Sequence, residues 1–184
     1  MKAVLISIQP KWIELICSSK KTIELRKSKP TLETPFKVYI YETQGRTETP
    51  FIDEDGHEIF KGRGRVIGEF ICDDIDTVGA YNGVLYCVKN SQPDKLKQMC
   101  LSYEEVKKYL GEKNIGYGWH ISDLVIYDDP IGLSEFTKYG LGELVPWKRP
   151  PQSWGYCLKL LPPLAEPKGK TIKIPKWTYK GETE

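Results

Sequence analysis

Ser19-Lys-Lys-Thr-Ile-Glu-Leu-Arg26 is the stretch from which the fold of this chain can be worked out. Apolar and polar residues alternate through its second half, which is the period of a β-strand. On an extended backbone, Ile23 and Leu25 lie on one side, while Glu24 and Arg26 lie on the other. The alternation predicts a half-buried strand whose polar face carries a carboxylate beside a guanidinium.

The residues before this stretch predict a strand and then a short helix. Residues 2–9 are mostly apolar and include β-branched side chains, which favours a strand. Pro10 suits the first turn of a helix, and Trp12, Leu15 and Ile16 then recur at helical spacing. The chain thus begins with a strand, a helix and the charged strand.

The residues after the charged strand predict several more strands and one well-defined helix. Ser102-Tyr-Glu-Glu105 is a capping-box pattern that starts a helix, and Gly111 can end it. A short helix is also predicted at residues 133–139. Strands are predicted at residues 36–41, 65–75, 116–127 and 153–161.

This order of elements favours a mainly β protein with peripheral helices, in the α+β class. A parallel doubly wound sheet needs a helix between nearly every pair of strands, and the chain offers too few helices. We therefore expect a mostly antiparallel β-barrel.

The length of 184 residues fits one domain with appendages. Residues 42–64 are polar and contain five glycines and prolines, which predicts an inserted loop or hairpin. Residues 162–184 are rich in proline and lysine, which is typical of a tail. We expect one domain over residues 1–161, with residues 162–184 as a C-terminal tail.

The charge of the chain is low overall but locally concentrated. A formal net charge of +2 does not support a uniform electrostatic attraction for nucleic acid. Residues 18–29, however, hold five basic residues against Glu24 alone, and Lys61-Gly-Arg-Gly-Arg65 adds three more. These segments predict two basic patches on a neutral protein.

The five cysteines are widely spaced and form no CxxC or other zinc-ligand pattern. They are typical of reduced, mostly buried thiols in a cytoplasmic protein, so we expect no metal and no cofactor. No apolar run approaches the roughly 18 residues that a membrane span needs, so we expect no membrane association. The sequence indicates nothing about protein partners.

The charged stretch resembles the GxKxxExR signature of the ASCH family. Lys21, Glu24 and Arg26 match that signature, Ser19 takes the place of its glycine, and the stretch follows a strand and a helix. Four later segments add to the likeness: Gly64-Arg-Val-Ile-Gly-Glu-Phe-Ile71, the capped helix, Tyr117-Gly-Trp-His-Ile-Ser122 and Pro150-Pro-Gln-Ser-Trp154. Residues 1–161 are similar to an ASCH protein of the bacterial and phage type.

This resemblance implies a PUA-like barrel with a cleft beside the first helix, in a superfamily whose members bind RNA or modified bases. Lys21 and Arg26 would then hold a phosphate or a base edge, and Glu24 would accept a hydrogen bond from an exocyclic amine. The expected ligand is RNA or a nucleotide-like molecule. The alternative is a solvated strand face without a ligand.

Other candidate ligand contacts lie outside the signature. Bases stack on aromatic rings, so Trp12, Trp119 and Trp154 are candidates, although core packing explains a tryptophan equally well. His120 could contact a base edge or act as a general base, or be structural. Arg63 and Arg65 could reach phosphates, or belong to an exposed turn.

Hydrolysis is the second functional hypothesis. Some ASCH proteins are amidohydrolases of acetylated cytidine, and one is a ribonuclease; Lys21 matches the amidohydrolase lysine, but Glu24 stands where those enzymes have a threonine nucleophile. If the chain is an enzyme, Lys21 is the base and Glu24 activates water. Acid-base catalysis at neutral pH needs a carboxyl with a raised pKa, and two neighbouring cations lower it, which favours binding. A protein-protein scaffold is a third hypothesis.

Overall fold

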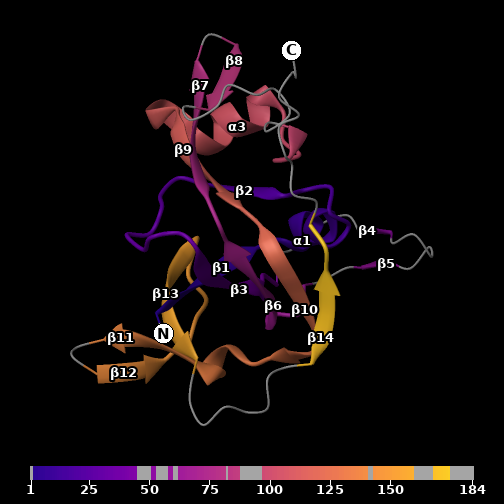
Figure 1. The fold of residues 1–184 in the computed structure, drawn as a ribbon, viewed down its shortest axis with the longest axis vertical. Coiled ribbons are helices and arrows are strands. Elements are labelled where there is room, and N and C mark those ends of the chain that lie inside the picture. The colour runs from indigo at the N-terminus through magenta and orange to yellow at the C-terminus, as the bar shows by residue number, and fades with distance from the viewer. Residues whose placement is uncertain are drawn as a thin grey trace, which may run out of the picture.

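The computed structural model describes residues 2–44, 51–52, 58–59, 62–81, 83–87, 97–140, 143–159 and 168–174. Within these ranges the chain is mostly strand, and the helices α1 (Pro10–Cys17) and α3 (Tyr103–Leu110) lie outside the strands (Figure 1). The strands are β1 (Ala3–Ile8), β2 (Ile23–Arg26), β3 (Phe36–Glu42), β4 (Phe51–Ile52), β5 (Glu58–Ile59), β6 (Val66–Cys72), β7 (Ile75–Tyr81), β8 (Val84–Cys87), β9 (Ile115–His120), β10 (Ser122–Ile131), β11 (Phe136–Gly140), β12 (Glu143–Pro146), β13 (Trp154–Lys159) and β14 (Gly169–Ile172).

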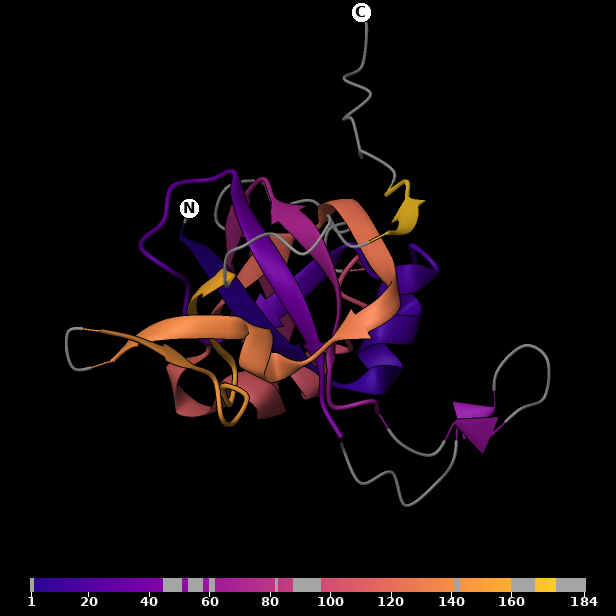
Figure 2. The ribbon, with the colours of Figure 1, turned by 90° about the horizontal axis from the view of Figure 1, so that it is seen from below.

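The larger sheet has eight strands in the order β12-β11-β13-β1-β3-β6-β10-β14. β1 and β3 pair in parallel, because α1 and β2 form the crossover between them, and the other pairs of the described strands are antiparallel. In Figure 2 these strands curve beside one another, with α1 next to them. α1 therefore connects β1 of the larger sheet to β2 of the smaller sheet.

The smaller sheet has four strands in the order β2-β9-β7-β8. Two chain paths run directly from strand to strand between the two sheets: β6 continues into β7 after Asp73 and Asp74, and β9 continues into β10 after Ile121. At these bends the backbone leaves its ladder, since His120 N donates to Asp74 O, and Ile121 N donates to Thr22 O. Asp123 is left-handed, with φ of 46°.

The mainly β class with peripheral helices is confirmed. The sheets, however, are not closed into one barrel, because the ladder is interrupted where the two chain paths bend. The long strands predicted at residues 65–75 and 116–127 are each divided at these bends.

The core explains why the smaller sheet stays against the larger one. Trp119 and Ile121 pack with Val4, Ile6 and Phe70 of the larger sheet in one apolar cluster. On the other face of the smaller sheet, a second cluster joins strand residues to α3. Each fully buried side chain of this size contributes roughly 1.5–3 kcal/mol.

β2 lies between these two environments. Ile23 and Leu25 pack toward α3, as the alternation predicts, while Glu24 and Arg26 face the other way. The prediction of a half-buried strand was wrong, because all four residues of β2 are buried on both faces. The polar face is therefore interior, and its charges need partners within the protein.

Two helix predictions have different outcomes. The capping box is confirmed: Ser102 Oγ accepts from Glu105 N, and Gly111 ends α3 with φ of 67°. The helix predicted at residues 133–139 was wrong, since only Leu133–Glu135 forms a 3-10 turn and Phe136 begins β11. Phe136 is fully buried in a strand that pairs with β13, so packing overrides the local pattern.

The insertion and the tail are described in part. β4 and β5 pair as a small antiparallel sheet within the predicted insertion at 42–64, and residues 45–50, 53–57 and 60–61 lie outside the described residues. Within the predicted tail, β14 pairs with β10, so this part of the tail extends the larger sheet. The domain boundary at residue 161 stays a prediction.

Candidate functional site

Lys21, Glu24 and Arg26 form a buried charged triad at the edge strand of the smaller sheet. Their residue exposures are 1%, 3% and 8%, respectively. Lys21 Nζ lies 3.3 Å from Glu24 Oε2, and Arg26 Nη1 pairs with Glu24 Oε1. The triad thus carries two cations and one anion out of contact with most of the solvent.

Backbone carbonyls supply the remaining partners of the two cations. Lys21 Nζ donates to Met99 O at 2.6 Å, from the segment before α3. Arg26 Nη2 donates to Ser7 O at 2.7 Å, at the end of β1, and Nη1 donates to Leu25 O at 3.0 Å. Because these carbonyls come from three parts of the chain, the triad is fixed in position only in the complete fold.

Two opposing effects set the ionisation of Glu24. Burial raises its pKa, but the charges of Arg26 and Lys21 and the hydrogen bond from Arg26 outweigh it, so the pKa of Glu24 lies below its usual range. Glu24 is therefore a carboxylate at neutral pH.

The triad leaves two buried polar atoms without a hydrogen bond in the described part of the chain: Glu24 Oε2 and Arg26 Nε. Lys21 is close enough to Oε2 for an ion pair, but it directs its hydrogen bond to Met99. Unmade hydrogen bonds on buried groups cost about 1–3 kcal/mol each. A ligand with a donor for Glu24 and an acceptor for Arg26 would remove that cost.

A cleft of about 590 Å³ opens above the triad, between the first turn of α1 and α3. An adjoining hollow of about 400 Å³ shares part of this lining and extends toward Ser153. Basic groups dominate the cleft, with five cations against two carboxylates. The charged lining residues are Lys11, Lys21, Arg26, Lys27, Lys108, Glu24 and Glu105.

Two aromatic side chains from different helices line both hollows. Trp12 of α1 has Lys11 Nζ at 4.3 Å and Lys21 Nζ at 5.0 Å from its ring centroid. Tyr109 of α3 has Lys27 Nζ at 5.2 Å from its ring centroid. Each ring therefore offers a stacking surface with a cation beside it.

The structure places the other two predicted tryptophans outside the cleft lining. Trp119 is fully buried as the register partner of Glu24, and its centroid lies 5.8 Å from that of Phe36. Trp154 packs against Trp119 at 5.7 Å, and its Nε1 donates to Ser28 Oγ at 3.1 Å. Both rings pack in or against the core, which is the alternative that the sequence left open.

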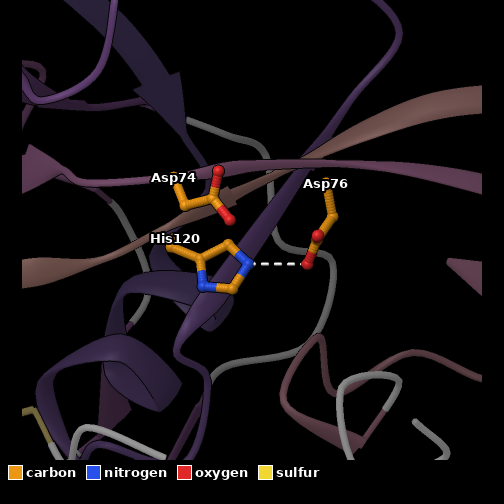
Figure 3. Close-up of side chains that lie close together, drawn as sticks. All are labelled: Asp74, Asp76 and His120. Atoms are coloured by element: carbon orange, nitrogen blue, oxygen red, sulfur yellow. Dashed lines mark hydrogen bonds and ion pairs between the residues drawn. The ribbon is translucent and has the colours of Figure 1, made fainter. Parts of the chain in front are cut away.

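His120 lies on the opposite face of the smaller sheet from the triad. Its Nε2 is 2.7 Å from Asp76 Oδ2, and Asp74 is next to the same ring (Figure 3). The ligand atoms of these three residues lie within 4.8 Å of one another, and their types suit a transition metal. His120 therefore lies outside the cleft lining, and its contact with a base edge stays a prediction.

The two predicted arginines also lie apart from the cleft. Arg63 is exposed, and its backbone N donates to Glu42 Oε2 at 2.7 Å. Arg65 is exposed, and its Nη1 donates to Pro130 O at 3.3 Å. Lys61, which completes this basic segment, lies outside the described residues.

Sequence reasoning missed Lys108 and Tyr109, and with them the α3 side of the cleft. The capping box located the helix, but it could not show that its last turn faces β2. Gln9 and Gln152, which also line the cleft or its adjoining hollow, were missed because the sequence does not show that the segments before α1 and β13 meet at β2. A charged residue beside an exposed tyrosine on a capped helix was the available signal.

Comparison with known proteins rests on structure. No family model matches the chain, and no curated protein matches its sequence. The crystal structure of ASCH from Zymomonas mobilis superposes with a TM-score of 0.52 over 84% of this chain and 86% of that chain, at 18% identity. The chain has an ASCH-like fold.

A second crystal structure of the Zymomonas mobilis protein, a serine-to-alanine variant, agrees with this. It superposes with a TM-score of 0.53 at 18% identity and covers 84% of this chain and 87% of that chain. The structural likeness thus spans most of this chain and most of the Zymomonas mobilis chain.

Among the described residues of the present chain, no helix is long and apolar enough to cross a membrane.

The buried triad predicts a pH-dependent effect of Glu24→Gln. The substitution leaves two buried cations without their anion, which costs about 3–5 kcal/mol. Because the pKa of Glu24 is lower in the folded protein than in the unfolded chain, its contribution is present above about pH 4.3 and is lost as the pH falls through the folded value. Urea unfolding of both proteins between pH 7 and pH 3 should show a stability difference that shrinks toward low pH.

Glu104→Gln is the matched control, because Glu104 is exposed on α3 and carries the same charge. It should change stability little at any pH. A stability loss for Glu24→Gln that is constant with pH, or that grows as the pH falls, would contradict the ionised triad.

Proposed function

We propose that this chain binds RNA or a nucleotide in the cleft above Lys21, Glu24 and Arg26. The observation that carries the proposal is the buried triad with one acceptor, Glu24 Oε2, and one donor, Arg26 Nε, left open beneath a basic cleft. A fold gains little from burying such a network for stability alone. Recognition of a polar ligand supplies a reason for keeping it.

The chemistry of the lining matches the base and the phosphate of a nucleotide. A base edge offers donors and acceptors side by side, which suits Glu24 and Arg26. Trp12 and Tyr109 provide surfaces on which a base can stack, for about 1–3 kcal/mol per base. The exposed lysines at the rim, Lys27 and Lys108, can pair with phosphates.

Binding is favoured over hydrolysis by the ionisation of Glu24. A general acid or base that works near neutral pH needs a carboxyl whose pKa is raised toward 7. The pKa of Glu24 is shifted downward instead, so it is a weak base. Lys21 is committed to Met99 O and to the ion pair, which also disfavours a role as the base.

The ASCH-like fold and the cysteines support an intracellular site of action in this proposal. None of the five cysteines forms a disulfide, as is usual in a reducing compartment, and we place the protein in the cytoplasm. The proposed partner is RNA or a nucleotide, and the proposed site requires no cofactor.

Removing the rim lysines should weaken binding mainly at low salt. We expect the double variant Lys27→Ala/Lys108→Ala to bind a fluorescent eight-nucleotide single-stranded RNA less tightly, because two phosphate contacts are lost. The slope of log K against log salt should fall by about 1.4, from about 0.7 per contact. Fluorescence anisotropy at several salt concentrations measures both quantities.

Lys138→Ala/Lys170→Ala is the charge-matched control, since both lysines are exposed and lie outside the cleft lining. This control should leave affinity and slope nearly unchanged. Equal losses in the two double variants would show that the RNA responds to net charge and would remove the cleft from the proposal.

The wild-type protein should release no product from acylated nucleosides. Incubation followed by chromatography tests this, with Glu24→Gln run alongside. Turnover by the wild type that disappears in Glu24→Gln, with ligand binding retained, would establish the hydrolase instead.

A further inference from the structure

We infer that single-stranded RNA leaving the cleft continues along the triad-bearing face of the smaller sheet, over an exposed platform formed at its hairpin end by Tyr81, Val84, Tyr86 and Ile115. This inference rests on the proposed function and narrows its ligand from a free nucleotide to a polynucleotide.

The strand register places the platform on the same sheet face as the triad. Arg26 pairs with Tyr117, which pairs with Thr77. Two residues further along the sheet, Ile115 pairs with Gly79, which pairs with Tyr86. Because residues opposite one another in a ladder share a face, one surface runs from Arg26 to Tyr86.

The last pair of the hairpin extends this surface, since Tyr81 pairs with Val84. Crossing from β2 to β8 takes three inter-strand steps, or about 14 Å.

At the hairpin end, the side chains on this face are exposed within the described part of the chain. Tyr81 is 65% exposed, Val84 62%, Ile115 48% and Tyr86 39%. The opposite face of the same strands is buried against α3 in the second apolar cluster. In Figure 1 the β7–β8 hairpin extends away from the larger sheet, with α3 beside it. Four large apolar side chains thus face away from both cores.

The ring of Tyr86 is held in place by a close backbone approach. A Cβ built on Gly79 would lie 2.1 Å from Tyr86 Cζ and 2.6 Å from its Cε1, so the ring crosses the β7 backbone directly above the glycine. Glycine in a strand marks such an approach. A ring held in this way loses little freedom when a base stacks on its open side.

Basic groups accompany this surface where it leaves the cleft. Lys29 Nζ lies 5.5 Å from the ring centroid of Tyr117, and Lys27 lies beside Tyr109 at the cleft rim. A surface that alternates aromatic rings with cations suits single-stranded RNA, because its bases stack on the rings while its phosphates pair with the cations. Four side chains are few for a stable protein–protein interface, since such interfaces bury roughly 1,200–2,000 Å² of total surface.

A length series separates the platform from the cleft. Wild-type protein should bind an eight-nucleotide single-stranded RNA more tightly than a mononucleotide. In Tyr81→Ala/Tyr86→Leu, affinity for the eight-nucleotide RNA should fall about 25-fold or more, since two stacks are lost and each costs at least about fivefold. Mononucleotide affinity should stay within twofold of the wild type, and Tyr86→Phe should restore most of the octamer affinity lost through Tyr86.

Leu144→Ala is the matched control, as Leu144 is a 50% exposed apolar residue on β12. It should leave both affinities unchanged. Octamer affinity that is unchanged in the platform variant, with wild-type mononucleotide binding intact, would overturn the platform but not the cleft. Failure of the wild type to bind either ligand would instead refute the proposed function, and the platform with it. Concentration-dependent self-association that the platform variant abolishes, with octamer affinity unaffected, would assign the platform to a second copy of the chain and overturn the inference.

Discussion

The ion pairs that join Lys21, Glu24 and Arg26 are the interaction on which the arrangement of this molecule depends. Removing these charges from water is costly, and the cost is met by mutual attraction and by the carbonyls of Met99 and Ser7. One of these carbonyls precedes α3 and the other ends β1. Satisfying the triad therefore requires both sides of the cleft to be in place, which links the stability of the fold to the geometry of the site.

β2 lies between the site and the second apolar cluster. Its side chains can pack closely over the neighbouring strand β9, because β9 has glycines next to β2. A Cβ on Gly118 would lie 2.8 Å from Ile23 Cγ2, and one on Gly116 would lie 3.0 Å from Arg26 O. With no side chains at these two positions, the apolar face of β2 packs tightly toward α3. The charged face is then held against the larger sheet, where it forms the cleft floor.

The sequence predicted those features of the fold and the site that depend on residues close together in the chain. Alternation located the charged strand and separated Glu24 and Arg26 from its apolar side, and the Ser102 capping box located α3. The bends that interrupt the barrel could not be foreseen, because they depend on contacts between distant segments such as His120 N with Asp74 O. The same limit hid Tyr109, whose place in the cleft is set by how α3 packs on the sheet.

Aromatic residues show why residue type alone predicts a site poorly. Trp12 and Trp119 have the same chemistry, yet one lines the cleft and the other is fully buried in the core. His120 is likewise next to Trp119 in sequence but on the opposite face from the triad, where it bonds to Asp76. Strand alternation settles these differences only once the register is known.

Direct observation of the Arg26 side chain during ligand titration tests the central claim. In a ¹⁵N-edited NMR experiment, adding a mononucleotide or a short single-stranded RNA should shift the Arg26 Nε–H resonance and the Trp12 indole resonance. The buried indole of Trp147, which lies outside the cleft lining, should not move. Binding that leaves Arg26 Nε–H and Trp12 unchanged while shifting signals elsewhere would contradict recognition at the charged triad.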